Sequence, residues 1–332
     1  MSPKVTIVGA AGGIGSALTY TLATSCEPYE VALIGRRPET ITAQLMDLEA
    51  LAAGQDSGTV RAGNVKDFTD SDIIVFTAST PFDPGRKNRA DFLAANAEIL
   101  RPYFLAVADL PEHWPGHVII VSNPVDPLVT WLARHARIDR RHILGYNWND
   151  SLRLRAAVAR TAQVQACQVE AWMLGEHGEN CVALFDQVHI TGSRLELPQE
   201  RQDEILGEIT QFYSRWTSLG LARTTMWSTS NGVAQLIELI TASQTGIRAA
   251  SILLAGEYGL RDVSLGVPVR IDDGSVSEIL EWTISSAATE RLRTAAEVVC
   301  CQAATLDHLE PEVAASQNPA MLPENIKALT LS

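Results

Sequence analysis

The sequence lacks the features that mark several large classes of protein. Lys and Arg number 26 against 39 Asp and Glu, for a formal net charge of −13, so a nucleic-acid surface, which needs a basic patch, is not expected. The five cysteines are scattered and form no CxxC pair, which argues against a disulfide framework or a metal site and favours a reducing cytoplasm. No apolar run reaches the roughly 18 residues of a membrane span, and no signal-peptide pattern precedes the first strand. We therefore expect a cytoplasmic protein that engages neither nucleic acid, metal nor membrane.

Hydrophobic residues, 46% of the 332, fall into segments that alternate between strand and helix patterns over the first half. This alternation predicts an α/β fold with a doubly wound, Rossmann-type parallel sheet. We expect a dinucleotide-binding domain over residues 1–147, an α+β substrate domain over 148–308, and a tail over 309–332 that either wraps a neighbour or is disordered. The first domain has predicted strands at Lys4–Ala10, Glu30–Ile34, Thr59–Ala62, Asp72–Ala78 and His117–Ser122, and predicted helices at Gly13–Thr24, Pro38–Ala53 and Ala90–Ala108.

A glycine-rich stretch closes the first of these strands and opens a helix. In that context it predicts dinucleotide binding, because one glycine makes a tight turn, a second lets backbone approach a pyrophosphate, and a third lets the helix pack on the sheet. The N–H groups and positive dipole of the helix start also favour phosphate. The alternative is a plain strand–helix turn. The candidate cofactor-binding residues are Gly9, Gly12, Gly13, Ile14 and Gly15.

The end of the second strand reads Gly35-Arg36-Arg37, where an NAD-binding chain places an acid for the adenosine ribose. No carboxylate is there to repel a 2′-phosphate, and two guanidinium groups can pair with one. We therefore predict NADP as the preferred cofactor, with NAD still possible. The alternative is that both arginines are solvated surface charges and that NAD is used without discrimination.

A long, basic loop, Ser79–Arg89, precedes the helix Ala90–Ala108. Loops of this length inside compact domains are usually functional, so this one either closes over an anionic substrate or is a solvated surface loop. Asn96, on the helix, is a further cofactor candidate. Asn123 follows the strand His117–Ser122, and the carboxyl ends of such strands are where open α/β sheets bind ligands. Asn123 is thus a candidate cofactor-binding residue.

His177 lies in a turn between Gly175 and Gly178, directly after an apolar run. Histidine suits reversible proton transfer near neutral pH, although a lone histidine in a turn is more often an exposed surface residue. Asp150 and Arg153, at i and i+3 of a predicted helix, share one face. The aspartate could orient an imidazole and the guanidinium could clamp a substrate carboxylate. The alternative is a helix-capping acid with a surface ion pair.

The rest of the second half is predicted as mixed strands and helices, and Arg155 is expected to meet solvent because it lies off the face of Asp150 and Arg153. The predicted strands are Gln165–Leu174, Val182–Ile190, Ala249–Leu254 and Asp262–Ile271, and the predicted helices are Asp150–Ala162, Gln199–Gly220, Asn231–Ala242 and Ser277–Ala304.

Five motifs occur in an order that resembles the lactate/malate dehydrogenase family, over roughly residues 4–304. They are GAAGGIG at Gly9–Gly15, SNPVD at Ser122–Asp126, NDSLRLR at Asn149–Arg155, GEHG at Gly175–Gly178 and LGVPV at Leu265–Val269. The resemblance implies roles in catalysis for five residues. His177 matches the proton donor and acceptor, Asp150 its orienting partner, Arg153 the carboxylate clamp, Asn123 a substrate ligand and Arg89 the loop arginine that polarises the substrate carbonyl.

The sequence departs from that family's pattern at the cofactor acid and around the substrate side chain. Where malate dehydrogenases carry an arginine for a second carboxylate, counting along the loop gives Phe82 or Asp83, although Arg86 or Lys87 could substitute. Trp227 falls where the family has a smaller residue facing the substrate, unless it packs in the core. These departures favour a substrate other than malate.

The sequence therefore predicts an NADP(H)-preferring oxidoreductase that interconverts a 2-oxo and a 2-hydroxy acid, with no metal. It is expected to act as a homodimer or homotetramer, which is usual in the family that it resembles. The alternatives are malate dehydrogenase proper and a nucleotide-binding sensor without catalysis. A related NAD-requiring glycosidase is disfavoured because Cys167 and Cys181 show no Cys/His metal arrangement.

Overall fold

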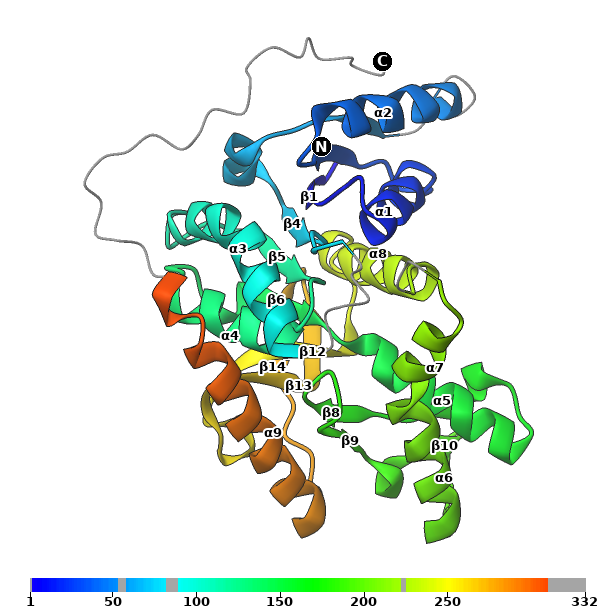
Figure 1. Cartoon of the computed structure of the whole chain (residues 1–332). Helices are drawn as coiled ribbons and strands as arrows, with labels where there is room; N and C mark the ends of the chain where they lie inside the picture. The colour runs from blue at the N-terminus through cyan, green and yellow to red at the C-terminus, as the bar shows by residue number, and fades with distance from the viewer. Residues whose placement is uncertain (1, 53–57, 82–88, 222–224, 310–332) are drawn as a thin grey trace.

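The computed structural model describes residues 2–52, 58–81, 89–221 and 225–309. Its first half alternates strands and helices as predicted, around a parallel sheet (Figure 1). The strands are β1 (Lys4–Val8), β2 (Glu30–Ile34), β3 (Thr59–Ala62), β4 (Ile73–Phe76), β5 (His117–Ile120) and β6 (Ile143–Tyr146). The helices are α1 (Gly13–Ala23), α2 (Pro38–Ala52), α3 (Arg89–Ala108) and α4 (Val125–His135). Strand β6 and helix α4 go beyond the predicted set.

The strand order β3-β2-β1-β4-β5-β6 identifies this half as a Rossmann-type, doubly wound sheet. All five strand pairings are parallel, so the carboxyl ends of β1, β4 and β5 meet along one edge. The order of the strands switches between β1 and β4: β2 and β3 follow on one side of β1, whereas β4 to β6 follow on the other. Such a switch point is where these sheets bind ligands. The glycine-rich stretch after β1 therefore lies at this crevice.

The second half extends the same sheet and adds a small second one. Strand β12 pairs antiparallel with β6, so one sheet runs from the first half into the second half. The strands of this half are β7 (Val169–Glu170), β8 (Met173–Gly175), β9 (Cys181–Ala183), β10 (His189–Ile190), β11 (Ser193–Arg194), β12 (Gly246–Ala255), β13 (Arg261–Asp272) and β14 (Ser275–Ile279). The helices are α5 (Trp148–Ala162), α6 (Gln199–Thr210), α7 (Phe212–Ser218), α8 (Trp227–Thr241) and α9 (Ser286–Ala304).

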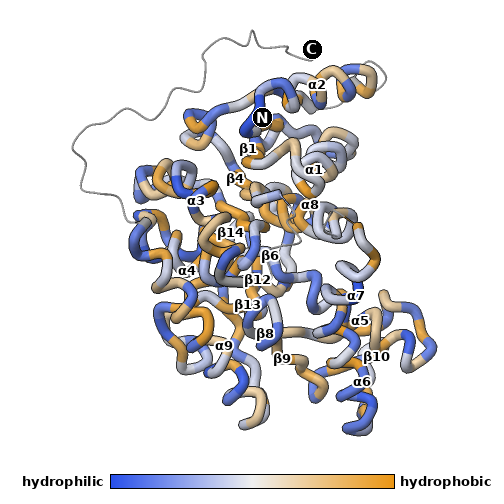
Figure 2. The backbone as a smooth tube through the Cα atoms, in the orientation of Figure 1, coloured by the Kyte–Doolittle hydropathy of each residue, from blue (hydrophilic) through white to orange (hydrophobic). Residues whose placement is uncertain are grey.

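Helices cover both faces of the sheet, as strand β4 shows. Ile73 and Val75 belong to the core formed with α1, α2 and α8, whereas Ile74 and Phe76 belong to the core formed with α3 and α4. Side chains alternate between faces along a strand, so a strand that is apolar throughout must be covered on both sides. Helices at the periphery, by contrast, have one side toward solvent, and Figure 2 shows that helices such as α6 carry both hydrophilic and hydrophobic residues. Among the described residues, no helix combines the length and apolar character that crossing a bilayer requires.

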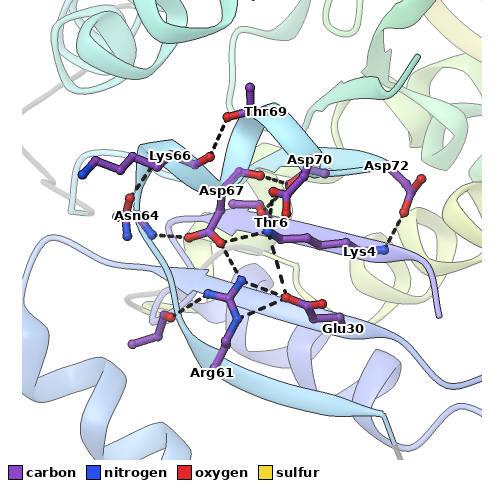
Figure 3. Close-up of polar contacts among 12 residues, drawn as sticks. Lys4, Thr6, Glu30, Arg61, Asn64, Lys66, Asp67, Thr69, Asp70 and Asp72 are labelled. Atoms are coloured by element: carbon purple, nitrogen blue, oxygen red, sulfur yellow. Dashed lines mark hydrogen bonds and ion pairs between the residues drawn. The ribbon is translucent and has the colours of Figure 1, made fainter. Parts of the chain in front are cut away.

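A network of charged residues ties the first three strands together at the start of β1 (Figure 3). The Lys4 ammonium lies 2.9 Å from the Asp67 carboxylate and 2.5 Å from that of Asp70. The Arg61 guanidinium lies 2.5 Å from Asp67 and 2.8 Å from Glu30. Lys4 is buried, and a buried charge of this kind is tolerated only when it is paired.

The predicted helix Ser277–Ala304 is wrong at its start. Residues Ser275–Ile279 form strand β14, which folds back on β13 through Asp273-Gly274, both with positive φ. An Asp-Gly pair between alternating apolar residues is a strong signal for a two-residue hairpin, and it overrides the helical pattern here. The helix begins at Ser286, and the Ser285 hydroxyl accepts a hydrogen bond from the Ala288 amide at 3.2 Å.

Several other boundaries in the second half also differ from prediction. The single helix expected over Gln199–Gly220 is divided into α6 and α7 at Gln211. The first of the two long strands expected around the His177 turn begins as a 3-10 turn and then divides into the short strands β7 and β8. The second is interrupted by a 3-10 turn between β9 and β10. Helix α8 starts four residues before the predicted Asn231. Local apolar runs thus identified the segments correctly but not where the backbone bends within them.

Candidate active site

The turn between β8 and β9 brings His177 onto the first turns of helix α5. Its Nδ1 atom lies 2.5 Å from the Oδ2 atom of Asp150, and the Arg153 Nη1 atom donates to Oδ1 of the same carboxylate at 3.0 Å. The i, i+3 spacing places Asp150 and Arg153 on one helix face, as expected. The side chains of His177 and Arg153 remain 22% and 25% exposed. Both side chains therefore retain exposed surface that a ligand can reach, next to the carboxylate that joins them.

The charges in this cluster reinforce one another. Burial alone would lower the pKa of His177, but the charge and hydrogen bond of Asp150 outweigh it, so the pKa is raised. Burial would likewise raise the pKa of Asp150, but His177 and Arg153 lower it. The carboxylate therefore stays ionised and favours the imidazolium form. Because Nδ1 faces Asp150, proton exchange with a ligand falls to Nε2, as in other His–Asp pairs.

Helix α7 adds an aromatic contact that sequence reasoning missed. The Arg153 guanidinium carbon lies 4.2 Å from the ring centroid of Phe212, within the range of a cation–π contact. Asp150 and Phe212 thus fix the guanidinium from two directions. Nothing in the spacing of Phe212 and Arg153 along the sequence could have indicated this contact, because α7 packs here only in the tertiary structure.

Arg155 does not face solvent, so that prediction is wrong. Its guanidinium lies 4.6 Å from the ring centroid of Trp148 and 5.3 Å from that of Trp172, and its Nε donates to the Ala171 carbonyl at 3.2 Å. Burial lowers the pKa of Arg155. Both tryptophan rings stack near the long side chain. Trp148 lies seven residues earlier on the same helix, so spacing could have indicated that contact, but Trp172 reaches Arg155 only through the tertiary structure.

The glycine-rich stretch has the form of a phosphate cradle. Gly9 has φ +88°, and a Cβ atom there would lie 2.4 Å from the backbone nitrogen of Ala78, so no other residue fits between β1 and β4. Helix α1 begins at Gly13, after Gly12, without a side-chain cap and without an acid in its first turn. The helix start, including Ile14 and Gly15, therefore presents backbone N–H groups and positive dipole to an anion. These features fit the pyrophosphate of a dinucleotide.

The residues after β2 present two exposed arginines beside that cradle. Gly35, Arg36 and Arg37 connect β2 to α2, and both arginine side chains are exposed. In the part of the chain that the structure describes, neither guanidinium takes part in an ion pair. Both are therefore available to an anionic ligand.

Asn96 and Asn123 lie together at the carboxyl edge of the sheet. The buried Asn96 amide donates to the Asn123 carbonyl at 2.5 Å and accepts from the Thr80 amide at 2.7 Å. The Asn96 amide thereby links the ends of two strands, at the edge where Asn96 was predicted to contact the cofactor. The Asn123 side chain is exposed at this edge, and Asn96 holds its backbone.

The substrate-specificity candidates are placed unevenly. Phe82, Asp83 and Arg86 lie outside the described residues, and Arg89 is described only as the first residue of α3. Trp227 is the first residue of α8 and is 66% exposed, so the alternative that it packs in the core is wrong. In the described ranges, no three His, Cys, Asp or Glu side chains gather as a metal site requires.

The start of α8 reaches both halves of the site. The Thr229 hydroxyl accepts a hydrogen bond from the Asn149 amide of α5 at 2.8 Å, and the Ser230 hydroxyl donates to the Ile14 carbonyl of α1 at 3.1 Å. Trp227 precedes these contacts by one turn or less, so α8 carries it to the region between the glycine-rich cradle and α5.

Comparison with known proteins agrees with this arrangement. The family model for the lactate/malate dehydrogenase NAD binding domain matches residues 3–145, and the model for the alpha/beta C-terminal domain of the same family matches residues 149–301. The chain belongs to the lactate/malate dehydrogenase family. It is thus an oxidoreductase of the lactate/malate dehydrogenase type, with a nicotinamide-nucleotide-binding domain and a small-molecule substrate.

Individual members of the lactate/malate dehydrogenase family are similar to the chain over nearly its whole length. A malate dehydrogenase of Halobacterium salinarum is 33% identical over 304 residues, which cover 90% of this chain and 98% of that protein. L-lactate dehydrogenase 2 of Lactiplantibacillus plantarum is 28% identical over 293 residues, or 87% and 94% of the two chains. Among solved structures, the malate dehydrogenase of Cryptosporidium parvum superposes with a TM-score of 0.83 at 21% identity, covering 93% of this chain and 100% of that one, which shows a shared fold.

Proposed function

We propose that this member of the lactate/malate dehydrogenase family is an NADP(H)-preferring oxidoreductase that interconverts a 2-oxo acid and a 2-hydroxy acid, with His177 as proton donor and acceptor. The observation that carries the proposal is the contact of Asp150 with both His177 and Arg153. Through its two oxygens, the same buried acid holds a proton-exchanging group and a carboxylate-binding group.

The proton step follows from the charges around His177. In the direction of reduction, the imidazolium Nε2 gives its proton to the carbonyl oxygen of the 2-oxo acid, and the neutral ring takes it back in oxidation. Asp150 stabilises the imidazolium and fixes the ring. Arg153 binds the carboxylate of the acid in a bidentate pair, which orients C2 of the substrate toward His177. Asn123 and Arg89 are proposed to hold the reacting oxygen, Arg89 by stabilising developing negative charge.

The cofactor is proposed to lie across the crevice between β1 and β4. Gly9, Gly12, Gly13, Ile14 and Gly15 would hold the pyrophosphate, and Gly35, Arg36 and Arg37 the adenosine ribose with its 2′-phosphate. Bound there, nicotinamide supplies or accepts the hydride at C2 of the substrate. The preference for NADP rests on the two exposed arginines and on the absence of an acid at Gly35-Arg36-Arg37.

The substrate side chain is proposed to meet Trp227 and the loop that carries Phe82 and Asp83, which favours an acid other than malate. Malate dehydrogenase proper is the second candidate, with Arg86 or Lys87 binding a second carboxylate. The relative of Halobacterium salinarum, at 33% identity, carries the name malate dehydrogenase, which favours this candidate.

We further propose the division into domains at 1–147 and 148–308, with a tail at 309–332, and a cytoplasmic homodimer or homotetramer. The two family-model matches, which change over between residues 145 and 149, support the division.

A panel of 2-oxo acids, assayed with both NADH and NADPH, tests the proposed function. The proposal expects higher kcat/KM with NADPH, and an acid other than oxaloacetate as the best substrate. Oxaloacetate turnover far above that of pyruvate and bulkier acids would establish malate dehydrogenase instead. Binding of NADPH without turnover of any acid would identify a nucleotide-binding sensor.

A further inference from the structure

A second buried carboxylate, separate from Asp150, also contacts His177. Asp126, in the first turn of α4, is 1% exposed. Its Oδ2 atom accepts the backbone N–H of His177 at 2.7 Å, and its Oδ1 atom accepts the Ser251 hydroxyl of β12 at 2.6 Å. Two carboxylates therefore hold the histidine: Asp150 contacts its ring, and Asp126 accepts a hydrogen bond from its backbone N–H.

The surroundings of Asp126 compensate its charge only in part. A buried carboxylate needs an opposite charge or several hydrogen bonds, and here it has one amide, one hydroxyl and the positive end of α4. No Lys or Arg in the described part of the chain forms an ion pair with it. An asparagine could accept the same amide hydrogen and donate to the same serine. The hydrogen bonds alone thus do not account for a carboxylate at this position.

We propose that Asp126 is a positioning residue for His177: it anchors the backbone of the turn between β8 and β9, and its negative charge favours the imidazolium. The proposal rests on the proposed function of His177 as the proton donor. It assigns two separable effects to one side chain, because the anchor requires only an acceptor oxygen whereas the stabilisation of imidazolium requires ionised Asp126.

The charged groups around the pair support the second effect. After burial and the two effects of Asp150, the charge of Asp126 is the next influence that raises the pKa of His177, and Arg153 opposes it. Burial raises the pKa of Asp126 itself to about 6, against the hydrogen bonds from Ser251 and His177 and the charge of His177, while the charge of Glu176 adds to the rise. Asp126 is therefore ionised at neutral pH and loses its charge under mildly acidic conditions.

The variant Asp126→Asn separates the two effects. It keeps an acceptor for the His177 amide and removes the charge. We expect the pH at which reductive kcat/KM declines to move down by about half a unit or more relative to wild type, with the melting temperature nearly unchanged. Asp126→Ala removes the anchor as well, and its kcat should fall at least tenfold with little change in the affinity for NADPH.

Two further variants keep the proposal testable if Asp126→Asn does not fold. Ser251→Ala removes one of the hydrogen bonds that favour ionised Asp126, so the profile should shift in the same direction by a smaller amount. Ser264→Ala is the matched control, because that buried hydroxyl on β13 has no hydrogen-bond partner within the described residues. Its profile should superimpose on that of wild type.

The titration of the His177 ring, followed by NMR in wild type and Asp126→Asn, gives a readout that needs no turnover. The proposal expects a lower pKa of His177 in the variant. Unchanged titration and unchanged pH profiles in both Asp126→Asn and Ser251→Ala, with wild type active, would overturn it and leave Asp126 a purely structural acid. If wild type turns over no 2-oxo acid, the proposed function fails, while the NMR titration still decides whether Asp126 acts on His177.

Discussion

The Asp150 carboxylate accepts the Nδ1–H of His177 at 2.5 Å, in a site where both side chains are mostly buried. Replacing Asp150 by Asn keeps the shape of the side chain but removes the charge that stabilises imidazolium. We expect kcat for 2-oxo acid reduction to fall by about 10²- to 10⁴-fold, the range associated with loss of general acid–base catalysis. Steady-state kinetics measure the loss, and an unchanged dissociation constant for NADPH serves as the control. A variant with near wild-type kcat would show that the pair does not take part in the reaction.

The raised pKa of His177 fixes the direction of the pH dependence. Reduction requires the protonated ring. The kcat/KM for reduction is therefore expected to be at its maximum at lower pH and to decline as pH rises through the raised pKa of His177. Oxidation of the 2-hydroxy acid requires the neutral ring and should increase over the same interval. Rate measurements in both directions across this range provide the test. Profiles that fall together would contradict a single group with opposite roles.

The exposed pair Arg36 and Arg37 should discriminate between the two nicotinamide cofactors. Charge-assisted hydrogen bonds to a phosphate contribute about 1.5–3 kcal/mol, so the double variant Arg36→Ala/Arg37→Ala should lose roughly 10- to 100-fold in affinity for NADPH. Affinity for NADH should change much less, because NADH has no 2′-phosphate. Fluorescence titration with both cofactors measures the difference. Arg293→Ala, an exposed arginine on α9, is the control. Equal losses for NADPH and NADH would mean that the arginines are only surface charges.

The contact of Phe212 with Arg153 should matter for substrate binding more than for the chemical step. Cation–π contacts contribute about 0.5–2 kcal/mol, so Phe212→Ala is expected to raise KM for the 2-oxo acid by a few-fold to about 30-fold. The value of kcat should change little, because His177 and Asp150 are untouched. The neighbouring Tyr213, exposed on the same helix, gives a matched control in Tyr213→Ala. A fall in kcat at unchanged KM would argue against the clamp role of Arg153.

The charge network at the start of β1 predicts how stability depends on pH. Burial would raise the pKa of Asp67, but Arg61, the Asn64 amide and Lys4 outweigh it, so the pKa is lowered in the folded chain. The stabilisation is therefore present above the unfolded pKa and is lost as pH falls through the folded one. Asp67→Asn should lower the free energy of unfolding at neutral pH by about 3 kcal/mol, since it leaves Lys4 with an incomplete set of partners.

Thermal unfolding of the Asp67→Asn variant and wild type at several pH values measures this effect. The gap between the two should narrow in acid. Asp186→Asn is the matched control, because Asp186 is 72% exposed and lies 4.0 Å from Arg194, and exposed pairs contribute little. A gap that does not depend on pH would show that the ionised form of Asp67 is not what stabilises the network.

The parts of the fold that follow from short-range patterns could be predicted from the sequence. Apolar strands such as β1 and the glycines after it were placed correctly, and so was the shared face of Asp150 and Arg153. Prediction failed where tertiary packing or a turn decides. Arg155 contacts Trp148 of its own helix but also Trp172 from the segment between β7 and β8, and residues with a helical pattern form part of the Asp273-Gly274 hairpin instead.

The same reason explains what sequence reasoning missed in the candidate site. Asp126 was noticed as part of a motif, but its two hydrogen bonds join segments 51 and 125 residues away. No spacing rule connects such distant positions. Every residue except proline has a backbone N–H, so the sequence does not indicate that the one of His177 binds a carboxylate. Local chemistry could therefore name the reacting groups, but not the residues that hold them.

The most direct test of the central claim compares wild type with His177→Gln. Both proteins are assayed for oxidation of NADPH across the panel of 2-oxo acids, and the dissociation constant for NADPH is measured in both. If His177 is the proton donor, the variant binds NADPH as wild type does, yet its turnover falls by at least about 100-fold with every acid. Turnover close to that of wild type with any acid, in a variant that still binds NADPH, would contradict the proposed mechanism.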